Sequence, residues 1–292
     1  MKSFIVNKNH KSTKLVDIIL EEYPTLSFGV LSKAFRKKDV KVNGKRVSGE
    51  TTVKLNDLIE IYIIDSFFEK DDIFSFEIVY EDDNILIVNK PQGLIVHSDT
   101  KETKDTLINK INEYLKEKKQ SAKLCHRIDR NTGGIVISAK NEEALKCIKE
   151  KLNSNEIEKY YICEVYGIPK KKSALLKAHL TKNAKTGMVY VNERPEKNSL
   201  EILTEYKVFK EKKDTSILEI KLLTGRTHQI RAHLAYMGHQ IIGDGKYGKN
   251  EINKLFKKKK QQLWAYKIVF NLSSPCLLSY LNDRIFKINI PL

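Results

Sequence analysis

The charge of this chain reverses between two neighbouring segments. Residues 29–46 contain seven Lys and Arg side chains and one acid, whereas residues 65–83 contain eight acids and one lysine. A reversal of this kind marks a boundary between separately folded segments. A length of 292 residues also favours two domains. We therefore predict a first domain over residues 1–64, an acidic linker over residues 65–74 and a second domain over residues 75–292.

The net charge is strongly positive. Lys and Arg number 53 against 37 Asp and Glu, a formal net charge of +16 at pH 7. Such a surplus favours a polyanionic partner, although a lysine-rich composition alone produces the same count. No apolar run approaches the length of a membrane span, and the N-terminus has no signal-peptide pattern. We expect a cytoplasmic, monomeric protein that binds no membrane.

The four cysteines form no C-x-x-C pair. This spacing argues against a disulfide scaffold and against a zinc site, and it favours reduced, mostly buried thiols.

The first domain is predicted to be a compact α/β unit. It shows two apolar helical faces, one of Leu15, Ile18 and Ile19 and the other of Val30, Leu31, Ala34 and Phe35. Asn43 and Gly44 separate two short alternating runs, and this pair indicates a hairpin because both residues can adopt positive φ. The segment Leu26–Ile63 resembles the alpha-L fold, a small RNA-binding domain named after ribosomal protein four of the small subunit.

A basic cluster would lie on one face of this helix and hairpin. Its members, which the resemblance makes candidates for RNA binding, are Lys33, Arg36, Lys37, Lys41, Lys45 and Arg46. The alternative is a solvated helix face beside a generic hairpin.

The second domain mixes strands and helices without strict β-α-β alternation, which favours an α+β fold. Strands are expected over Gly134–Ser138, Tyr160–Tyr166 and Ile217–Leu223. Leu107, Ile108, Ile111 and Leu115 trace one amphipathic helix. Asn141 is expected to cap another helix, whose first turn carries two acids and whose apolar face is Ala144, Leu145, Ile148 and Leu152.

Asp129 is the carboxylate that we single out. It lies between Arg127 and Arg130 in the sequence HRIDRNTGG, in a loop just before an apolar strand. Flanking cations favour the ionised acid, so Asp129 would be available as a nucleophile or a base at neutral pH. An aspartate beside arginines is more often a structural ion pair, and this segment alone does not decide between the two roles.

A second cluster is the strand-like sequence KYYICEVYG, residues 159–167. Tyr161, Cys163 and Val165 share one face of it because side chains alternate along a strand. Tyrosines in strands usually pack half-buried against their neighbours, so the pattern alone indicates no chemistry.

A third cluster is TGRTHQIRAHL, residues 224–234. Thr227 is expected to cap a helix that Gly238 ends. Arg231 lies one turn after the start of that helix, where the dipole disfavours a cation, so a carboxylate or phosphate partner is expected. His228 and His233 are five residues apart, unlike the i, i+4 pair of a zinc site, and we predict no metal.

Together these clusters resemble the signatures of the RluA family of pseudouridine synthases. HRIDRNTGGIVISAKN resembles H-R-L-D-x-x-T-S-G-L, and KYYICEVYG resembles K-x-Y-x-A-x-V-x-G. LLTGRTHQIRAHLAYMGHQIIGDGKYG resembles G-R-T-H-Q-I-R-x-H-x-x-x-x-G-H-P-I-x-G-D-x-x-Y-G. VYEDDNILIVNKPQGLIVH resembles the opening motif of the family, E-D-x-x-x-x-V-x-N-K-P-x-G. The resemblance covers Phe76–Leu292. It implies an α+β fold with a central mixed, mostly antiparallel sheet flanked by helices, and the isomerisation of uridine to pseudouridine in RNA.

The resemblance also implies roles for individual residues. Asp129 matches the catalytic aspartate of the family, Tyr161 the active-site tyrosine, and Arg231 the basic residue that pairs with the aspartate. Arg127 matches the arginine that fills the space left by a flipped uridine. The remaining residues of these motifs expected to bind RNA are His126, Arg130, Arg226, His228 and Gln229.

Four departures from the family pattern fall outside the catalytic positions. Asn131 stands for a usual Asp, Gly133 for Ser, Cys163 for Ala and Gln240 for Pro.

The reaction implied by the resemblance needs no metal, redox cofactor or group donor, and the chain has no Gly-rich phosphate loop, so no cofactor is expected. Large-subunit ribosomal RNA is the expected substrate and transfer RNA the alternative. The sequence does not choose between attack of Asp129 on the sugar and removal of a ribose proton.

Two other functions stay open at this point. A non-catalytic RNA-binding or ribosome-assembly protein with the same fold would bind RNA without forming product. A glycoside-type hydrolase acting on a nucleotide needs two carboxylates that face each other across the bond, and the sequence offers one convincing candidate.

Overall fold

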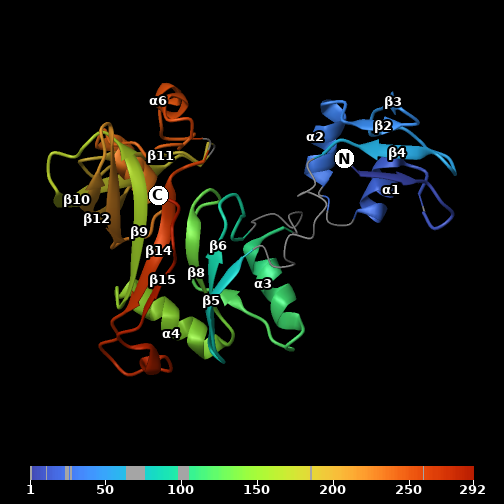
Figure 1. Ribbon diagram of the computed structural model, residues 1–292. Helices are drawn as coiled ribbons and strands as arrows, with labels where there is room; N and C mark the ends of the chain where they lie inside the picture. Colours follow the sequence, from blue (N-terminus) through green and yellow to red (C-terminus); the bar gives the residue numbers. More distant parts are fainter. Residues whose placement is uncertain are drawn as a thin grey trace. The chain divides into compact units, whose positions relative to one another are not determined.

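The computed structural model describes residues 2–10, 12–23, 26, 28–63, 76–97, 105–184, 186–258 and 260–292 (Figure 1). The chain forms two compact units, Met1–Ser75 and Phe76–Leu292, called here the N-terminal and C-terminal units. The predicted acidic linker, residues 65–74, lies outside the described residues. Within the described ranges, no helix has both the length and the apolar composition needed to cross a membrane.

The N-terminal unit packs two helices against a four-stranded antiparallel sheet of order β1-β4-β2-β3. Its elements are β1 (Lys2–Ile5), α1 (Leu15–Glu22), α2 (Phe28–Arg36), β2 (Val40–Val42), β3 (Lys45–Arg46) and β4 (Leu58–Ile61). Asn43 and Gly44, at φ 50° and 76°, turn β2 into β3, which confirms the hairpin. The core contains Leu15, Ile18, Ile19, Leu31 and Ala34 of the two predicted helical faces, and Phe35 packs against it partly buried. The side chain of Val30 lies outside the described residues.

The C-terminal unit is built on an eleven-stranded sheet. Its main path runs β11-β10-β12-β13-β9-β14-β8-β6-β5, with β15 beside β14 and β7 beside β8. The strands are β5 (Glu77–Glu81), β6 (Ile85–Lys90), β7 (Lys123–Leu124), β8 (Gly133–Ala139), β9 (Ile157–Tyr166), β10 (Ser173–Lys182), β11 (Val189–Asn192), β12 (Leu200–Glu211), β13 (Thr215–Leu222), β14 (Leu263–Phe270) and β15 (Ile285–Lys287). Every pairing is antiparallel except that of β8 with β14. This mixed, mostly antiparallel sheet confirms the α+β prediction.

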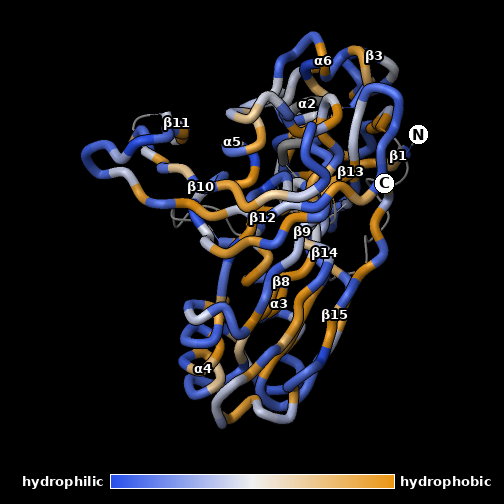
Figure 2. The backbone as a smooth tube through the Cα atoms, turned by 90° about the vertical axis from the view of Figure 1, so that its left-hand side faces the viewer, coloured by the Kyte–Doolittle hydropathy of each residue, from blue (hydrophilic) through white to orange (hydrophobic). Residues whose placement is uncertain are grey.

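Helices flank this sheet: α3 (Leu107–Lys116), α4 (Glu142–Asn153), α5 (Gln229–Tyr236), α6 (Asn250–Leu255) and the short 3₁₀ helix η2 (Ser279–Leu281). Asn141 caps α4 as predicted, since its side chain accepts a hydrogen bond of 2.8 Å from the Ala144 amide. The predicted apolar face of α4 is buried in a core shared with β8, β9 and β14. Figure 2 shows hydrophobic residues along these strands.

Two glycines join β8 to β14 at the centre of the sheet. At Gly134, with φ 115°, a Cβ atom would lie 2.1 Å from the Ala265 carbonyl oxygen. At Gly133 a Cβ atom would lie 2.8 Å from the Trp264 indole ring. The serine typical of the RluA family at position 133 would therefore require Trp264 to move. This close contact places the loop that carries Asp129 directly beside the middle strands.

Helix α5 begins at Gln229, so the prediction that Thr227 caps it was wrong. The N-cap is His228, in the left-handed conformation (φ 54°, ψ 18°) and without a side-chain cap. The Gln229 side chain instead accepts hydrogen bonds from the Arg226 amide (3.1 Å) and the Thr224 hydroxyl (2.9 Å). Gly238 follows the C-cap residue with φ 82°, which confirms the predicted helix end.

Candidate active site

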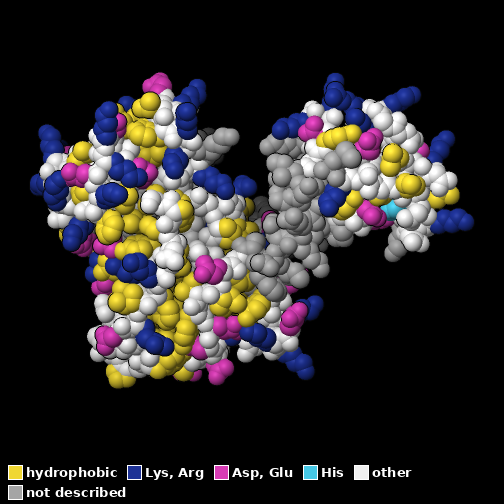
Figure 3. Space-filling model, in the orientation of Figure 1, with side chains coloured by type: hydrophobic (Ala, Val, Ile, Leu, Met, Phe, Trp, Pro, Cys, Tyr) yellow, Lys and Arg dark blue, Asp and Glu magenta, His cyan; other side chains and the backbone are white. Residues whose placement is uncertain are grey.

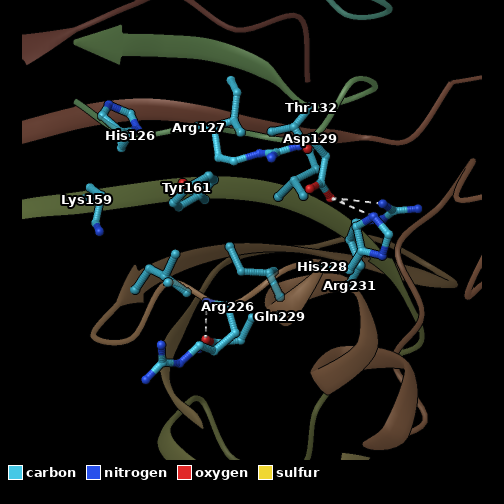
Figure 4. Close-up of a pocket in the computed structure, with 15 residues that line it drawn as sticks. His126, Arg127, Asp129, Thr132, Lys159, Tyr161, Arg226, His228, Gln229 and Arg231 are labelled. Atoms are coloured by element: carbon cyan, nitrogen blue, oxygen red, sulfur yellow. Dashed lines mark hydrogen bonds and ion pairs between the residues drawn. The ribbon is translucent and has the colours of Figure 1, made fainter. Parts of the chain in front are cut away.

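The three residues predicted to act together line one cavity of about 260 Å³ in the C-terminal unit. Asp129 comes from the loop before β8, Tyr161 from β9 and Arg231 from α5 (Figure 4). The apolar part of the lining is Ile128, Tyr161, Leu222, Ile230 and Leu263. The cavity therefore combines a carboxylate at one end with an apolar surface on which a planar base can pack.

Asp129 is paired with Arg231. Nη1 of Arg231 donates a hydrogen bond of 2.9 Å to Oδ2 of Asp129. The Asp129 side chain is 24% exposed and that of Arg231 only 8%. A charge-assisted hydrogen bond of this kind orients the carboxylate while one side of it faces the cavity.

Arg231 has a second carboxylate partner, Asp244, which the sequence analysis missed. Nε and Nη2 of Arg231 donate to the two oxygens of Asp244 at 2.6 and 3.0 Å. Asp244 also accepts from the amides of Lys246 and Tyr247 at 2.8 and 3.1 Å. Its side chain is 1% exposed. Both oxygens are occupied and shielded, so Asp244 orients Arg231 and is not placed to act as the second carboxylate of a hydrolase.

The ion pairs favour the charged forms of Arg231 and Asp244. Burial alone would lower the pKa of Arg231, but the hydrogen bonds and charge of Asp244, followed by those of Asp129, raise it well above its usual value. Burial would raise the pKa of Asp244, and the guanidinium of Arg231 outweighs this and lowers it. The expectation that Arg231 needs an anionic partner near a helix start is met by two carboxylates.

His228 lies between Asp129 and Tyr247. Its Nδ1 lies 2.8 Å from the Tyr247 hydroxyl, which itself accepts from the Val189 amide at 3.1 Å. This arrangement favours the tautomer with its proton on Nε2, which lies 4.0 Å from Oδ2 of Asp129. Burial lowers the pKa of His228, and the charge of Asp129 opposes that change. The left-handed backbone of His228 is unusual for a residue with a side chain and costs on the order of 1 kcal/mol.

Tyr161 forms the base-sized surface beside Asp129. It is 6% exposed, and burial together with the charge of Asp129 raises its pKa far above the usual value. The phenol is therefore neutral at physiological pH. It offers the reaction a flat apolar ring rather than a proton acceptor.

Lys90 fixes the loop that carries Asp129. Its side chain is fully buried at the end of β6, and Nζ donates to the carbonyl oxygens of Leu94 (2.8 Å), Pro91 (2.9 Å) and Arg130 (3.0 Å). Burial lowers the pKa of Lys90 to about 7, against the opposing charge of Asp129. This lysine thus ties β6 to the residue that follows Asp129, and the sequence showed it only as the lysine of the opening motif.

The arginines predicted to bind RNA lie around the entrance. Arg127, Arg130 and Arg226 are exposed, and they line a cavity of about 670 Å³ that adjoins the first and also contains Asp129 and Lys246. Nε of Arg130 donates to the Gly93 carbonyl at 3.0 Å. These side chains give the entrance a positive charge, which suits a phosphate backbone.

Two other residues in that prediction have internal roles. Gln229 is 2% exposed, and besides its two bonds to the 224–226 loop its Nε2 donates to the Leu203 carbonyl and the Thr204 hydroxyl, both at 3.0 Å. The Gln229 amide is thus held by the protein itself, although the residue lines the cavity, and its contact with RNA stays a prediction. His126 lines the cavity, but its Nε2 accepts from the Ile137 amide at 3.1 Å, and burial lowers its pKa to about 3. It is therefore a neutral ring that anchors the loop to β8.

The basic residues of the N-terminal unit lie at its surface. Arg36, Lys37, Lys45 and Arg46 are exposed, and Lys41 is half-buried with Nζ 4.6 Å from the centre of the Tyr62 ring. The side chain of Lys33, in α2, lies outside the described residues. Figure 3 shows Lys and Arg side chains along the edge of this unit. Across the parts of the chain that the structure describes, no group of three His, Cys, Asp or Glu side chains is arranged to hold a metal ion.

Comparison with known proteins places these features in a family. The model of the family described as RNA pseudouridylate synthase matches residues 84–236 of the 292. An uncharacterized RNA pseudouridine synthase of Mycoplasma capricolum is 31% identical over 98% of this chain and 96% of its own length. The ribosomal large subunit pseudouridine synthase C of Vibrio parahaemolyticus is 27% identical over 98% of this chain and 91% of its own.

Solved structures share the fold of about three quarters of this chain. Human RNA Pseudouridylate Synthase Domain Containing 4 superposes with a TM-score of 0.60 at 20% identity, covering 74% of this chain and 88% of the human one. Human RNA Pseudouridylate Synthase Domain Containing 1 gives a TM-score of 0.59 at 22% identity, covering 72% of this chain and 84% of the human one. Both the matched residues and the identity over nearly the whole length lead to one assignment: the chain belongs to the RNA pseudouridylate synthase family.

Proposed function

We propose that this pseudouridine synthase isomerises specific uridines in large-subunit ribosomal RNA, with Asp129 as its catalytic residue. The observation that carries the proposal is the pairing of Asp129 with Arg231 at one end of a cavity lined by Tyr161. The choice of RNA is supported by the similarity to a relative named as acting on the large ribosomal subunit and by the formal charge of +16.

Binding begins with the phosphate backbone. The exposed arginines at the entrance attract RNA without reading its sequence. The target uridine then leaves its stack and enters the cavity, at a cost of about a few kcal/mol. Arg127, exposed at the edge of both cavities, fills the vacated space, and the ring of Tyr161 packs on the flipped base.

The isomerisation then proceeds without loss or gain of atoms. The bond from N1 to C1′ breaks, and its electron pair stays on the base. Asp129 assists either by bonding to C1′ or by removing the C2′ proton, two routes that share the same ionised carboxylate. The detached base turns, C5 bonds to C1′, the C5 proton leaves, and N1 is protonated. If Asp129 has bonded to C1′, it is displaced when C5 bonds to C1′. If Asp129 has instead removed the C2′ proton, it returns that proton to C2′.

Arg231 and Asp244 hold Asp129 in place for this step. A guanidinium clamped on two edges has little freedom to turn, so the carboxylate that it binds is preorganised.

The N-terminal unit is proposed to be an alpha-L RNA-binding domain over residues 1–64, joined by an acidic linker over residues 65–74 to a catalytic domain over residues 75–292. The exposed members of the predicted basic cluster, at positions 36, 37, 45 and 46, support a contact with RNA phosphates.

The test is to map pseudouridines in RNA from a strain that lacks the gene and to restore them with purified protein. Loss and restoration of sites in large-subunit ribosomal RNA are expected. Loss and restoration of sites in transfer RNA alone would show that transfer RNA, and not ribosomal RNA, is the substrate. RNA that binds the protein but stays unmodified would identify a non-catalytic RNA-binding protein. Release of free uracil would point to hydrolysis.

A further inference from the structure

Lys159 extends from the same face of β9 as Tyr161, two residues away. Side chains two apart on a strand point the same way. Both residues line the cavity that contains Asp129, and Figure 4 shows them on one side of β9, with Tyr161 between Lys159 and Asp129. Nζ of Lys159 reaches toward the facing loop, where it would lie 3.7 Å from a Cβ atom on Gly225. The ammonium thus stands at the end of the cavity opposite the carboxylate.

Most polar groups around this cavity are already satisfied by the protein. Asp129 and Arg231 are paired, His228 contacts Tyr247, and all four hydrogen bonds of the Gln229 amide are internal. Thr132 accepts from Gln261 at 2.7 Å.

Lys159 differs from these groups. Within the described residues its ammonium makes no hydrogen bond and no ion pair, although the side chain is half-buried. Burial lowers its pKa, and no anion in the part of the chain that the structure describes counteracts this. Cations out of solvent are normally paired, so an unpaired one lining a substrate cavity indicates that the substrate supplies the acceptor.

The geometry of uracil identifies that acceptor. In uridine, N1 carries the ribose, and the ring atom opposite N1 is C4, whose oxygen O4 points away from the sugar. With the sugar at Asp129, O4 faces the far end of the cavity. In pseudouridine, C5 carries the ribose, and the atom opposite C5 is C2, whose oxygen is O2. The turn that exchanges N1 with C5 therefore exchanges O4 with O2 at the same place.

We propose that Lys159 is a specificity-determining residue whose ammonium donates to O4 of the flipped uridine, to the negative charge of the detached base, and to O2 of the product. An ammonium only donates, so it fits a carbonyl at this place and rejects the amino group that cytosine presents there. The proton stays on nitrogen throughout. This inference rests on the proposed site of Asp129 but not on the identity of the RNA.

The first experiment uses total RNA labelled with tritium at C5 of its uridines and taken from a strain that lacks the gene, because that RNA contains the unmodified target whatever its class. Pseudouridine formation releases the C5 hydrogen, so tritium in water reports the reaction under single-turnover conditions. Lys159→Met should slow the reaction about tenfold or more, and Lys159→Arg should retain more activity than Lys159→Met.

The matched control is Lys149→Met, which removes an exposed lysine of α4 from a neighbouring cavity while leaving the uridine cavity intact. It should change the single-turnover rate less than about twofold. Lys159→Met should also melt no lower than the wild type, because it removes a half-buried unpaired charge. An equal loss of rate in the Lys149 and Lys159 variants would mean that general positive charge is responsible, and would overturn the proposal.

The second experiment separates base recognition from a structural role. RNA with 4-thiouridine or 2-thiouridine at the mapped target replaces one carbonyl by sulfur, a weaker acceptor. For the wild type each substitution should cost about tenfold in rate, and for Lys159→Met less than about threefold. If the penalty is the same for both proteins, Lys159 does not contact the base. Wild-type protein inactive on every RNA would instead contradict the proposed function itself.

Discussion

Arg231 and Asp129 are separated by 102 residues in the chain, yet Nη1 of one lies 2.9 Å from Oδ2 of the other. The opposite edge of the same guanidinium is held by both oxygens of Asp244. One buried cation therefore serves two carboxylates, of which one is shielded and the other faces the cavity. The shielded carboxylate determines where the guanidinium points, and the guanidinium determines where the reactive carboxylate points.

Asp244→Asn should weaken both stability and activity. Loss of one charge from a buried, hydrogen-bonded pair costs about 3 kcal/mol of unfolding free energy, and the freed Arg231 should lower the single-turnover rate at least about tenfold. The control is Glu201→Gln, which breaks the exposed pair with Lys177 and should cost less than about 1 kcal/mol. Urea denaturation and tritium release measure the two effects. An Asp244→Asn protein as stable and active as the wild type would remove Asp244 from this account.

Tyr161→Phe should retain more activity than Tyr161→Leu. The neutral phenol contributes a ring that packs on the base, and phenylalanine keeps that ring while leucine does not. Single-turnover rates of the two variants decide the point. A phenylalanine variant as slow as the leucine variant would assign the role to the hydroxyl.

Lys90→Met should destabilise the loop that carries Asp129. It leaves three carbonyl oxygens, of Pro91, Leu94 and Arg130, without their donor, at a cost of about 3 kcal/mol or more. Lys116 of α3 is exposed, and Lys116→Met serves as the control for the loss of a lysine. Thermal unfolding should show a lower Tm for Lys90→Met but not for Lys116→Met. The activity of Lys90→Met should be reduced also at temperatures at which the variant is still folded. Equal Tm values would show that the three contacts contribute little.

Acid should destabilise the C-terminal unit partly through His126. Its pKa falls from 6.5 to about 3 on folding. Above pH 6.5 the ring is neutral in both states, and between pH 6.5 and 3 the unfolded chain binds a proton that the folded chain does not. Stability therefore falls with pH in this window, by about 2 kcal/mol at pH 5.

His126→Gln keeps an acceptor for the Ile137 amide but cannot take up the proton. Its loss of stability between pH 7 and pH 5 should be smaller than that of the wild type by about 2 kcal/mol. The single tryptophan, Trp264, lies in β14 and reports unfolding of this unit by fluorescence. An identical pH dependence in the two proteins would show that His126 titrates normally when folded.

Local patterns were the part of the fold that could be predicted from the sequence. Asn141 caps α4 and the Asn43-Gly44 pair forms a hairpin because each depends on a few adjacent residues. Thr227 does not cap the helix, because the Gln229 side chain accepts the hydrogen bond of the Arg226 amide in the same loop. Gln229 is held there by Leu203 and Thr204 of β12, which are distant in the sequence.

The site was predicted in its motifs but not in its connections. Asp129, Tyr161 and Arg231 were identified by resemblance, and the structure places them around one cavity. The partnership of Asp244 with Arg231 and the burial of Lys90 depend on tertiary contacts that no local pattern specifies. A lysine at the end of an apolar strand is ordinarily expected to reach solvent, whereas Lys90 turns inward to three carbonyls.

Replacement of Asp129 by asparagine tests the central claim most directly. The substitution keeps the shape of the side chain and a hydrogen-bond acceptor for Arg231 but removes the nucleophilic or basic charge. Pseudouridine is measured in RNA from the strain that lacks the gene, after treatment with wild-type or Asp129→Asn protein at equal RNA binding. The account predicts pseudouridine with the wild type and none above background with the variant; normal conversion by Asp129→Asn would contradict it.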